Sequence, residues 1–338
     1  MMRVRVVIPC RNEEAYIGKC VSSLVNAAQT DIQLSILVAD GMSDDGTRRE
    51  VLRLSELHSE VKLMDNIKRT TPFALNLGLR DLAYDVGIIL GAHAEVSPDF
   101  LIENVRVLRE HPEVGCAGGI ITNVHENELS RVISNAMSSP FGVGNAYFRT
   151  GGKSGYVDTV AFGAYRREVF EQVGFFDEDL VRNQDDEFNY RVTKAGFKIY
   201  LEPKIESKYY VRGSFSKLYK QYFQYGYWKV FVNRKHATIT TLRQLAPPLW
   251  MLSVSLGWLG FLIHPFLGYA YVGMILIYLT LAKFTAIRTA GWQIPMIFKL
   301  VACYMILHAS YGWGYLKGMF HFYVLRRNPT EGSQQLTR

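Results

Sequence analysis

Four short stretches of the sequence carry side chains whose types and spacing could do chemistry. In the first, "VADGMSDDGT", Asp40 directly follows a continuous apolar run. A carboxylate at the end of a buried strand can accept hydrogen bonds from a base N–H or a ribose hydroxyl, although Asp-Gly pairs also open ordinary turns. In the second stretch, Lys68 and Arg69 precede "TPFALNLGL". Cations beside a helix N-terminus favour a phosphate.

The third and fourth stretches are a small-residue turn and an acidic run. "IILGAHAEVSPDF" is an apolar run that ends in a turn bearing His93 and Glu95. Imidazole can ligate Mn²⁺, and it suits Mg²⁺ less well because hard cations prefer oxygen. In "VRNQDDEFNYRVTKAGFKI", Asp185, Asp186 and Glu187 stand in a row at an expected helix start. The helix macrodipole favours acids there, but three in succession exceed what a cap needs.

Strands that alternate with helices must position these side chains. Short apolar runs predict strands at 4–10, 34–40, 61–65 and 85–90, and helical spacing predicts helices at 12–27, 48–57, 71–82 and 97–111. Asn12 is the expected N-cap of the first helix. Because the strands lack in/out alternation, both faces of their sheet should be covered. The alternation predicts an α/β fold with a mostly parallel, doubly wound sheet. Beyond residue 111 the pattern loosens.

The last third of the sequence differs in composition. Overall, 49% of the 338 residues are hydrophobic and 20% are charged, but residues 245–316 carry very little charge. Apolar runs at 245–266, 267–282 and 294–316, with a tight hairpin at His264, predict two or three membrane spans. Lys283 and Arg288 place the second connection on the cytoplasmic side by the positive-inside rule. Lys299 and His308 weaken the third span, and the basic tail opposes it, so the count stays open.

Charge and cysteine usage bear on partners and location. The formal net charge is +7, with many basic residues between 203 and 243. They predict contact with anionic lipid headgroups or a solvated surface, and no nucleic-acid motif accompanies them. The aromatic and basic helix expected at 214–235 suits a membrane interface or docking on the core. Four scattered cysteines fit a reduced, cytoplasmic domain. The start, "MMRVRVVIPC", runs directly into a strand, so we expect no signal peptide.

Taken together and in order, these stretches resemble the inverting glycosyltransferase family 2, whose members have a GT-A fold. "VVIPCRNEEAYIGKCVSSL" resembles the family's opening strand and helix, and "VADGMSDDGT" its "DGGSTDGT" turn. "HAEVSPDFL" lies where the family has its DxD turn, and "NQDDEFNYRVTKAGFKI" resembles its ED-containing helix. The most similar branch is that of the ExoA-like glucosyltransferases of succinoglycan biosynthesis. The resemblance covers about residues 3 to 235 and continues weakly beyond.

The resemblance implies roles for matching positions. Asp185 would be the general base that takes the proton from an acceptor hydroxyl, a contribution of typically about 10²–10⁴ in rate. Asp40 would bond the base, expected to be uracil, and Lys68 or Arg69 would approach the ribose or phosphates. In "IESKYYVRGS", where the family often has a histidine, this sequence has Lys208 and Arg212 instead, and these cations could neutralise the diphosphate directly. The other implied donor-binding residues are Pro9, Arg11, Glu13 and Ala92, and the implied acceptor region is Gln184, Asp186, Tyr225 and Trp228.

Two departures from the family pattern concern the metal and the base. Gly91 and His93 stand in place of the two aspartates of the DxD turn, and Gln184 stands in place of the usual glutamate. Asp185, the implied base, is retained. We therefore expect an active enzyme that uses Mn²⁺ or Mg²⁺ with weakened or altered dependence, with His93 and Glu95 as candidate ligands.

The expected enzyme moves a hexose, with glucose as first candidate, from a UDP-sugar to a lipid-linked saccharide in polysaccharide biosynthesis. Its expected location is the cell's inner or plasma membrane, with the catalytic domain in the cytoplasm. Alternatives are direct transfer to polyprenyl phosphate, and a nucleotide-sugar-binding scaffold without turnover. The expected segments are a catalytic domain at 1–205, an interface segment at 206–243, a membrane region at 244–320 and a polar tail at 321–338. The oligomeric state stays open.

Overall fold

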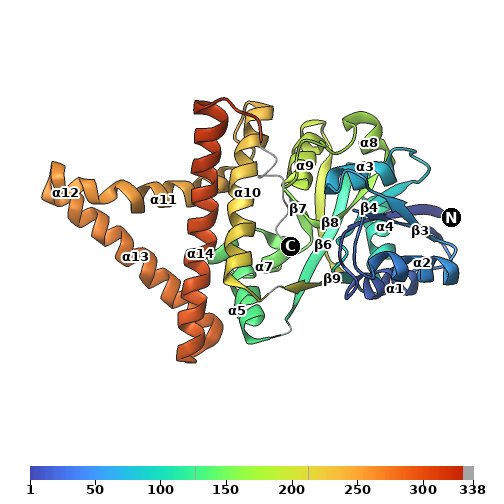
Figure 1. Ribbon diagram of the computed structural model, residues 1–338, viewed down its shortest axis with the longest axis horizontal. Coiled ribbons are helices and arrows are strands. Elements are labelled where there is room, and N and C mark those ends of the chain that lie inside the picture. The colour runs from blue at the N-terminus through green and yellow to red at the C-terminus, as the bar shows by residue number, and fades with distance from the viewer. Residues whose placement is uncertain (126, 212, 330–338) are drawn as a thin grey trace. The chain divides into compact units, whose positions relative to one another are not determined.

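The structure is a computed structural model that describes residues 1–125, 127–211 and 213–329. It divides into two units by its backbone contacts (Figure 1). Unit 1 comprises Met1–Val124 and Ala146–Tyr210, and unit 2 comprises His125–Asn145 and the chain from Val211 onward. A short internal segment thus belongs with the C-terminal helices rather than with the sheet that surrounds it in sequence.

The first part of unit 1 alternates strands and helices, as the sequence predicts. The elements are β1 (Met2–Cys10), α1 (Ile17–Asn26), β2 (Ile32–Asp40), α2 (Thr47–Leu57), β3 (Val61–Asp65), α3 (Thr71–Leu79), β4 (Val86–Ile89), β5 (Ala94–Val96) and α4 (Phe100–Glu110). β1 pairs in parallel with β2 and β4, and β2 pairs in parallel with β3. Parallel neighbours need crossover connections, and the helices supply them. The carboxyl ends of β1, β2 and β3 therefore meet at one edge.

The second part of unit 1 extends the sheet with antiparallel strands. Its elements are β6 (Val114–His125), α7 (Tyr147–Thr150), β7 (Gly155–Val157), β8 (Ala161–Arg166), α8 (Arg167–Val173), α9 (Gln184–Lys194) and β9 (Lys198–Val211). The sheet order is β3-β2-β1-β4-β8-β6-β9-β5, with β7 also paired to β9. The α/β fold is confirmed. The parallel arrangement holds as far as β4, and the sheet is mixed beyond it, where the alternation in the sequence also stops.

Two apolar clusters cover the two faces of this sheet. α1, α2 and α4 pack against one face, around buried Val6, Ile8 and Val38. α3, α8 and α9 pack against the other, around Val7 and Tyr165. Successive residues of β1 thus serve opposite faces, as in a strand covered on both sides. This explains why the strands read as continuous apolar runs.

The predicted start of α1 is wrong by several residues. The helix begins at Ile17 rather than just after Asn12. Asn12 has a positive φ of 55°, a left-handed conformation that asparagine tolerates better than most residues. Its side-chain oxygen accepts a hydrogen bond from the Asp44 backbone N–H at 3.1 Å. Asn12 therefore joins two loops at the carboxyl edge of the sheet instead of capping a helix.

Unit 2 is helical. Its elements are α5 (Glu128–Met137), α6 (Pro140–Val143), α10 (Phe215–His236), a 3₁₀ turn (Leu242–Leu245), α11 (Ala246–Leu256), a second 3₁₀ turn (Gly257–Leu259), α12 (Gly260–Ile263), α13 (Pro265–Ala290), α14 (Ile294–Met319) and a π-helical turn (Phe320–Val324). Within the described residues, three helical stretches are long and apolar enough to cross a membrane, Leu242–Ile263, Pro265–Ala290 and Ile294–Val324. His264 caps α13 at the predicted hairpin, accepting from the Phe266 N–H.

The two polar residues that count against the third stretch have partners inside unit 2. Lys299 forms an ion pair with Glu128 at 2.7 Å. His308 pairs with the Tyr278 hydroxyl at 2.9 Å and with the Phe141 carbonyl at 2.8 Å. Polar groups inside membrane helices are costly unless they are paired in this way. Their presence is therefore compatible with a third span.

α10 packs lengthwise against α14 within unit 2 (Figure 1). Trp228 and Val230 on α10 are fully buried. Glycines permit the close approach, because a Cβ at Gly226 would lie 2.1 Å from the Tyr311 carbonyl oxygen and one at Gly314 would lie 2.0 Å from that of Phe223. Small residues serve helix pairs in membranes in the same way.

We expect Gly314→Val to separate α10 from α14 and to lower the stability of unit 2. Overpacking of this kind typically costs about 1–3 kcal/mol, and here a backbone carbonyl would have to move. Gly273→Val on α13 is the matched control, because nothing lies within 4 Å of a Cβ at that position. Thermal unfolding of both full-length variants in one detergent measures the difference. Equal melting temperatures would contradict the proposed role of Gly314.

Candidate active site

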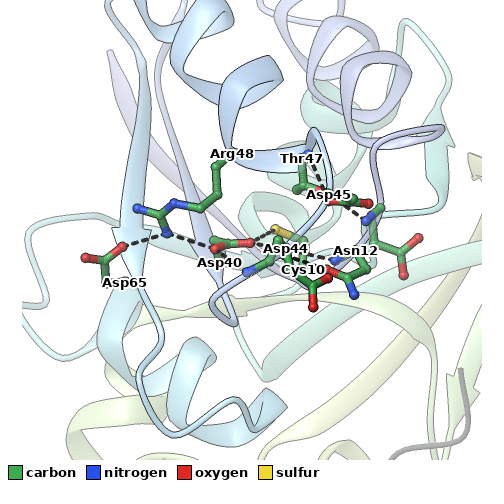
Figure 2. Close-up of polar contacts among 10 residues, drawn as sticks. Cys10, Asn12, Asp40, Asp44, Asp45, Thr47, Arg48 and Asp65 are labelled. Carbon is green, nitrogen blue, oxygen red and sulfur yellow. Dashed lines mark hydrogen bonds and ion pairs between the residues drawn. The ribbon is translucent and has the colours of Figure 1, made fainter.

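The turn between β2 and α2 is held by Asp40 and its neighbours (Figure 2). The Asp40 carboxylate accepts from the Ser43 backbone N–H at 3.0 Å and from Arg48 at 2.8 Å. Arg48 also pairs with Asp65, at the end of β3, at 2.8 Å. The thiol of Cys10, at the end of β1, lies 3.8 Å from the same carboxylate. Asp40 thus ties together the carboxyl ends of three parallel strands.

This arrangement refines the role predicted for Asp40. Its side chain is 0% exposed, and both of its oxygens already accept hydrogen bonds within the chain. Asp65 is 58% exposed at the same edge. Asp40 therefore builds the turn, and its predicted bond to a base stays a prediction. Gly41 follows it because an added Cβ would lie 3.2 Å from the Arg11 side chain and 3.3 Å from the Cys10 carbonyl.

A second group of side chains joins the loop after β1 to the turn before β5. His93 Nδ1 lies 2.9 Å from Glu13 Oε2, although the two residues are 80 positions apart. The Glu13 side chain is 7% exposed and that of His93 is 22% exposed. The Tyr16 ring lies 6.2 Å from the His93 ring and 5.2 Å from the Tyr210 ring, centroid to centroid. Since Glu13 holds Nδ1, the other ring nitrogen of His93, Nε2, is the one left to meet a ligand.

The predicted phosphate-binding cations lie in the loop between β3 and α3. Lys68 pairs with Glu178 at 2.9 Å, and Arg69 is exposed with a positive φ of 57°. Glu178 also accepts from Asn76 at 3.0 Å and pairs with Arg80 at 2.6 Å. Lys68 is therefore held by a carboxylate that an anionic ligand would have to displace. Any contact of Lys68 or Arg69 with a phosphate stays a prediction.

We expect Glu178→Gln to weaken unit 1 at neutral pH and to lose this effect in acid. Burial raises the pKa of Glu178, but hydrogen bonds from Asn76 and Lys68, with the charges of Lys68 and Arg80, outweigh it, and the pKa lies below its ordinary value. A lowered folded-state pKa stabilises the protein above the unfolded pKa, about 4.3, and this contribution is lost as the pH falls. Urea unfolding at pH 7 and pH 3.5 checks it, and a pH-independent difference from wild type would contradict it.

The three acids at the start of α9 have different environments. Asp185 is exposed, Asp186 is partly exposed, and Glu187 is 3% exposed and paired with Arg191 at 2.7 Å. Asn183, the N-cap residue, is left-handed with φ 60°. Tyr165 on β8 anchors the helix by donating to Asn189 at 2.9 Å. Burial raises the pKa of Tyr165, and the nearby Cys116 and the negative charge of Asp185 add to this.

Comparison with known proteins identifies the family of this chain. A sequence profile described as Glycosyl transferase family 2 matches residues 5–174. A dolichyl N-acetyl-alpha-D-glucosaminyl phosphate 3-beta-D-2,3-diacetamido-2,3-dideoxy-beta-D-glucuronosyltransferase from Methanococcus voltae is 35% identical over 240 residues, 69% of this chain and 74% of that protein. The chain belongs to glycosyl transferase family 2. The succinoglycan biosynthesis protein ExoA from Rhizobium meliloti (strain 1021) is 30% identical over 246 residues, 72% of this chain and 73% of that protein.

Solved structures support the fold of this family 2 enzyme. A mannosyltransferase, PcManGT from Pyrobaculum calidifontis in complex with GDP-Man and Mn²⁺, superimposes with a TM-score of 0.58 at 19% identity, over 95% of this chain and 88% of that one. GalNAc-T7 with UDP, GalNAc and Mn²⁺ gives 0.51 at 18% identity, over 63% of this chain and 44% of that one. The predicted GT-A fold is thereby confirmed. The family match and the two named relatives show that the chain is a glycosyltransferase.

The residues around the turn of this glycosyltransferase do not complete a metal site by themselves. Among the described residues, no three His, Cys, Asp or Glu side chains are grouped to hold an ion. Glu95 accepts from the Tyr210 hydroxyl, and His93 Nδ1 pairs with Glu13, so His93 Nε2 is the ring nitrogen of this turn that could meet an ion. Burial raises the pKa of the neighbouring Cys20 thiol to about 12, so it stays protonated at neutral pH and is no thiolate ligand. The described residues around this turn therefore offer an ion His93 as a ligand but no complete set of side-chain ligands.

The other predicted residues fall into two groups. Pro9 and Arg11 lie at the carboxyl end of β1, partly exposed, and Gln184 begins α9. Ala92 is 2% exposed in the core, so its backbone alone can meet a ligand. Arg212 lies outside the described residues. Tyr225 and Trp228 belong to unit 2, where Tyr225 accepts from Gln221 at 3.2 Å and Trp228 is fully buried. Full burial leaves Trp228 no surface for an acceptor in this structure, so it does not enter the site proposed below.

Sequence reasoning passed over three residues of this site. Arg48 and Asp65 complete the Asp40 cluster, and Glu178 holds Lys68. The position of Asp65 at the end of a predicted strand is a sequence signal that could have identified it. The sequence carries no such signal for Arg48 and Glu178, because an arginine or glutamate in a polar segment is usually a solvated surface residue.

Proposed function

We propose that this glycosyltransferase moves a hexose, with glucose as first candidate, from a UDP-sugar to a lipid-linked saccharide at the cytoplasmic face of a cell membrane. One observation carries the proposal: a family 2 catalytic unit is joined in one chain to three described helices long enough to cross a membrane. Such helices would keep the active site near a lipid-borne acceptor and raise its effective concentration. The name of the Methanococcus voltae relative, which states a dolichyl-linked sugar phosphate as substrate, supports this acceptor class.

In the proposed reaction, Asp185 is the general base. It is exposed at the first turn of α9, and the positive end of the helix dipole stabilises its charge. It would accept the acceptor's hydroxyl proton as that oxygen attacks C1 of the sugar from the face opposite the diphosphate. Configuration at C1 would therefore invert. Asp186 and Gln184, on the same turn of unit 1, remain the proposed acceptor contacts.

The proposed metal requirement is weak. A divalent ion, Mn²⁺ rather than Mg²⁺, would have His93 as its main protein ligand, since imidazole suits the softer ion. An ion held by one imidazole and by the donor's own oxygens binds only together with the donor. We therefore expect chelation to lower the rate without abolishing it.

A donor panel tests the proposal. The purified full chain in lipid is incubated with UDP- and GDP-sugars and a lipid-linked saccharide, in Mn²⁺, Mg²⁺ or EDTA, and nucleoside diphosphate release is measured. We expect release of UDP that depends on the acceptor. A preference for GDP-mannose would contradict the uracil assignment. Equal turnover with bare polyprenyl phosphate would replace the acceptor, and donor binding without release under any condition would favour the scaffold alternative.

A further inference from the structure

Arg149 is a half-buried cation for which the described residues supply no anionic partner. It lies on α7, the short helix Tyr147–Thr150 of unit 1. Its Nη1 is buried, and no acceptor among the described residues is within hydrogen-bonding distance of it. Its guanidinium lies instead over two aromatic rings, 5.4 Å from the centre of Phe148 and 5.9 Å from that of Tyr209. No ion pair of this side chain is found in the described ranges either, although most arginines of unit 1 have a carboxylate or carbonyl partner.

A cation in this condition needs an explanation. Buried donors are nearly always hydrogen-bonded, because a donor removed from water without an acceptor costs free energy, and a charged one costs more. The aromatic faces attract the charge but accept no conventional hydrogen bond. Arginine carries its positive charge as a permanent cation in proteins. The Arg149 guanidinium is therefore arranged to meet an anion that the described residues do not supply.

The position of Arg149 indicates which anion. The Tyr209 ring that it covers also contacts the His93 ring, with 5.7 Å between centroids. Tyr209 is placed there by strand pairing, since it lies opposite Ala94 in the β5–β9 ladder. Arg149 and His93 thus share one tyrosine ring beside the turn that stands in place of the family's DxD turn. The nearby carboxylates are engaged elsewhere, Glu13 with His93 and Glu95 with Tyr210.

We propose that Arg149 binds the diphosphate of the sugar nucleotide and neutralises part of its charge. This would compensate for the incomplete metal site at the Gly91-Ala92-His93 turn. This inference rests on the proposed function. In the reaction, the acceptor oxygen bonds to C1, and the C1–O bond to the diphosphate breaks with its electron pair remaining on the phosphate oxygen. The acceptor proton passes to Asp185. The fork of N–H donors on Arg149 matches adjacent phosphate oxygens and would stabilise the charge that develops there.

Binding measurements without turnover test this role. Calorimetry of the full chain in detergent with EDTA compares UDP, GDP, uridine and inorganic diphosphate. Arg149→Met should weaken binding of the nucleoside diphosphate by roughly tenfold to a hundredfold, the usual value of one charged hydrogen bond, and leave uridine unaffected. Arg149→Lys should fall between, since it keeps the charge without the fork. Arg109→Met, an exposed arginine on α4, is the matched control for the loss of one positive charge.

The outcomes separate this inference from the function on which it rests. Unchanged diphosphate affinity in a normally melting Arg149→Met protein would overturn the inference and leave Arg149 as a packing residue. Equal losses for UDP and uridine would overturn it too, because they indicate a general distortion. If the Arg149→Met protein has a lowered melting temperature, the Arg149→Lys variant tests the inference instead. A normal melting temperature with weakened diphosphate binding would support the inference, and unchanged diphosphate binding would overturn it. If wild type binds inorganic diphosphate through Arg149 but no nucleotide, the proposed function fails and the anion site stands.

Discussion

Asp185→Asn should lower turnover by about two to four orders of magnitude, the usual contribution of a general base, while the affinity for the donor is retained. The amide has the size of the carboxylate but cannot take up a proton at neutral pH. Asp185 is exposed at the start of α9, so its removal should leave the fold intact. The measurement is single-turnover sugar transfer beside calorimetric binding of UDP. It is the largest effect on activity that we expect from one substitution.

Asp31→Asn is the matched control for this experiment. Asp31 is also an exposed aspartate of unit 1, next to the start of β2, at the end opposite the catalytic edge. The same chemical change there should leave turnover at the wild-type level. If Asp185→Asn retains full turnover, Asp185 is not the base, and the mechanism proposed here is wrong. If donor binding collapses with turnover, Asp185 serves the donor site instead.

Glu187→Gln, two residues further along, should lower the stability of the fold, whereas Asp185→Asn should lower turnover and leave the fold intact. Its carboxylate is 3% exposed and receives two hydrogen bonds from Arg191, at 2.7 and 2.9 Å. Arg191 in turn donates to the Val173 and Phe175 carbonyls, each at 2.8 Å, which ties α9 to the end of α8. Breaking a buried pair by neutralising one partner typically costs about 3–5 kcal/mol, because the remaining charge is left uncompensated. We expect a loss of unfolding free energy near the lower end, about 3 kcal/mol, because Arg191 is 22% exposed.

Urea unfolding of the full chain, followed by far-ultraviolet circular dichroism, measures this loss of unfolding free energy. Asp185→Asn provides the internal comparison, and as an exposed substitution it should change the unfolding free energy by less than about 0.5 kcal/mol. The double variant Glu187→Gln with Arg191→Met should recover part of the loss, because it removes the uncompensated charge. A Glu187→Gln protein that unfolds like wild type but no longer turns over would reverse the assignments of Glu187 and Asp185.

The contrast between Asp185 and Glu187 shows the limit of pattern reasoning at this site. Three consecutive acids at a helix start look alike in sequence, and the macrodipole favours all of them. Successive residues of a helix point about 100° apart, so one faces solvent while another faces the core. Which one does so depends on where Phe188 and Val192 bury the helix, and both lie in the cluster on the α9 side of the sheet.

Local signals in the amino-acid sequence were enough to locate many elements of this protein. Apolar runs and helical spacing located the first strands and helices, turn chemistry located the β2–α2 connection, and the low-charge stretch located the membrane-length helices. The ordered motifs also identified the family, because their residue types and spacing are properties of the chain alone. The predicted start of α1 at Asn12 was wrong because Asn12, a residue type suited to capping a helix, instead accepts a hydrogen bond that joins two loops.

Contacts between residues far apart in the chain became visible only in the three-dimensional structure. It buried Asp40 beneath Arg48, joined Glu13 to His93 across 80 positions, and placed Arg149 over Tyr209. It made the sheet mixed beyond β4 and docked α10 on α14 through glycines. Burial and pairing of these groups follow from how the elements pack. Periodicity and propensity, which act over a few residues, carry no information about which distant side chain will occupy the neighbouring space.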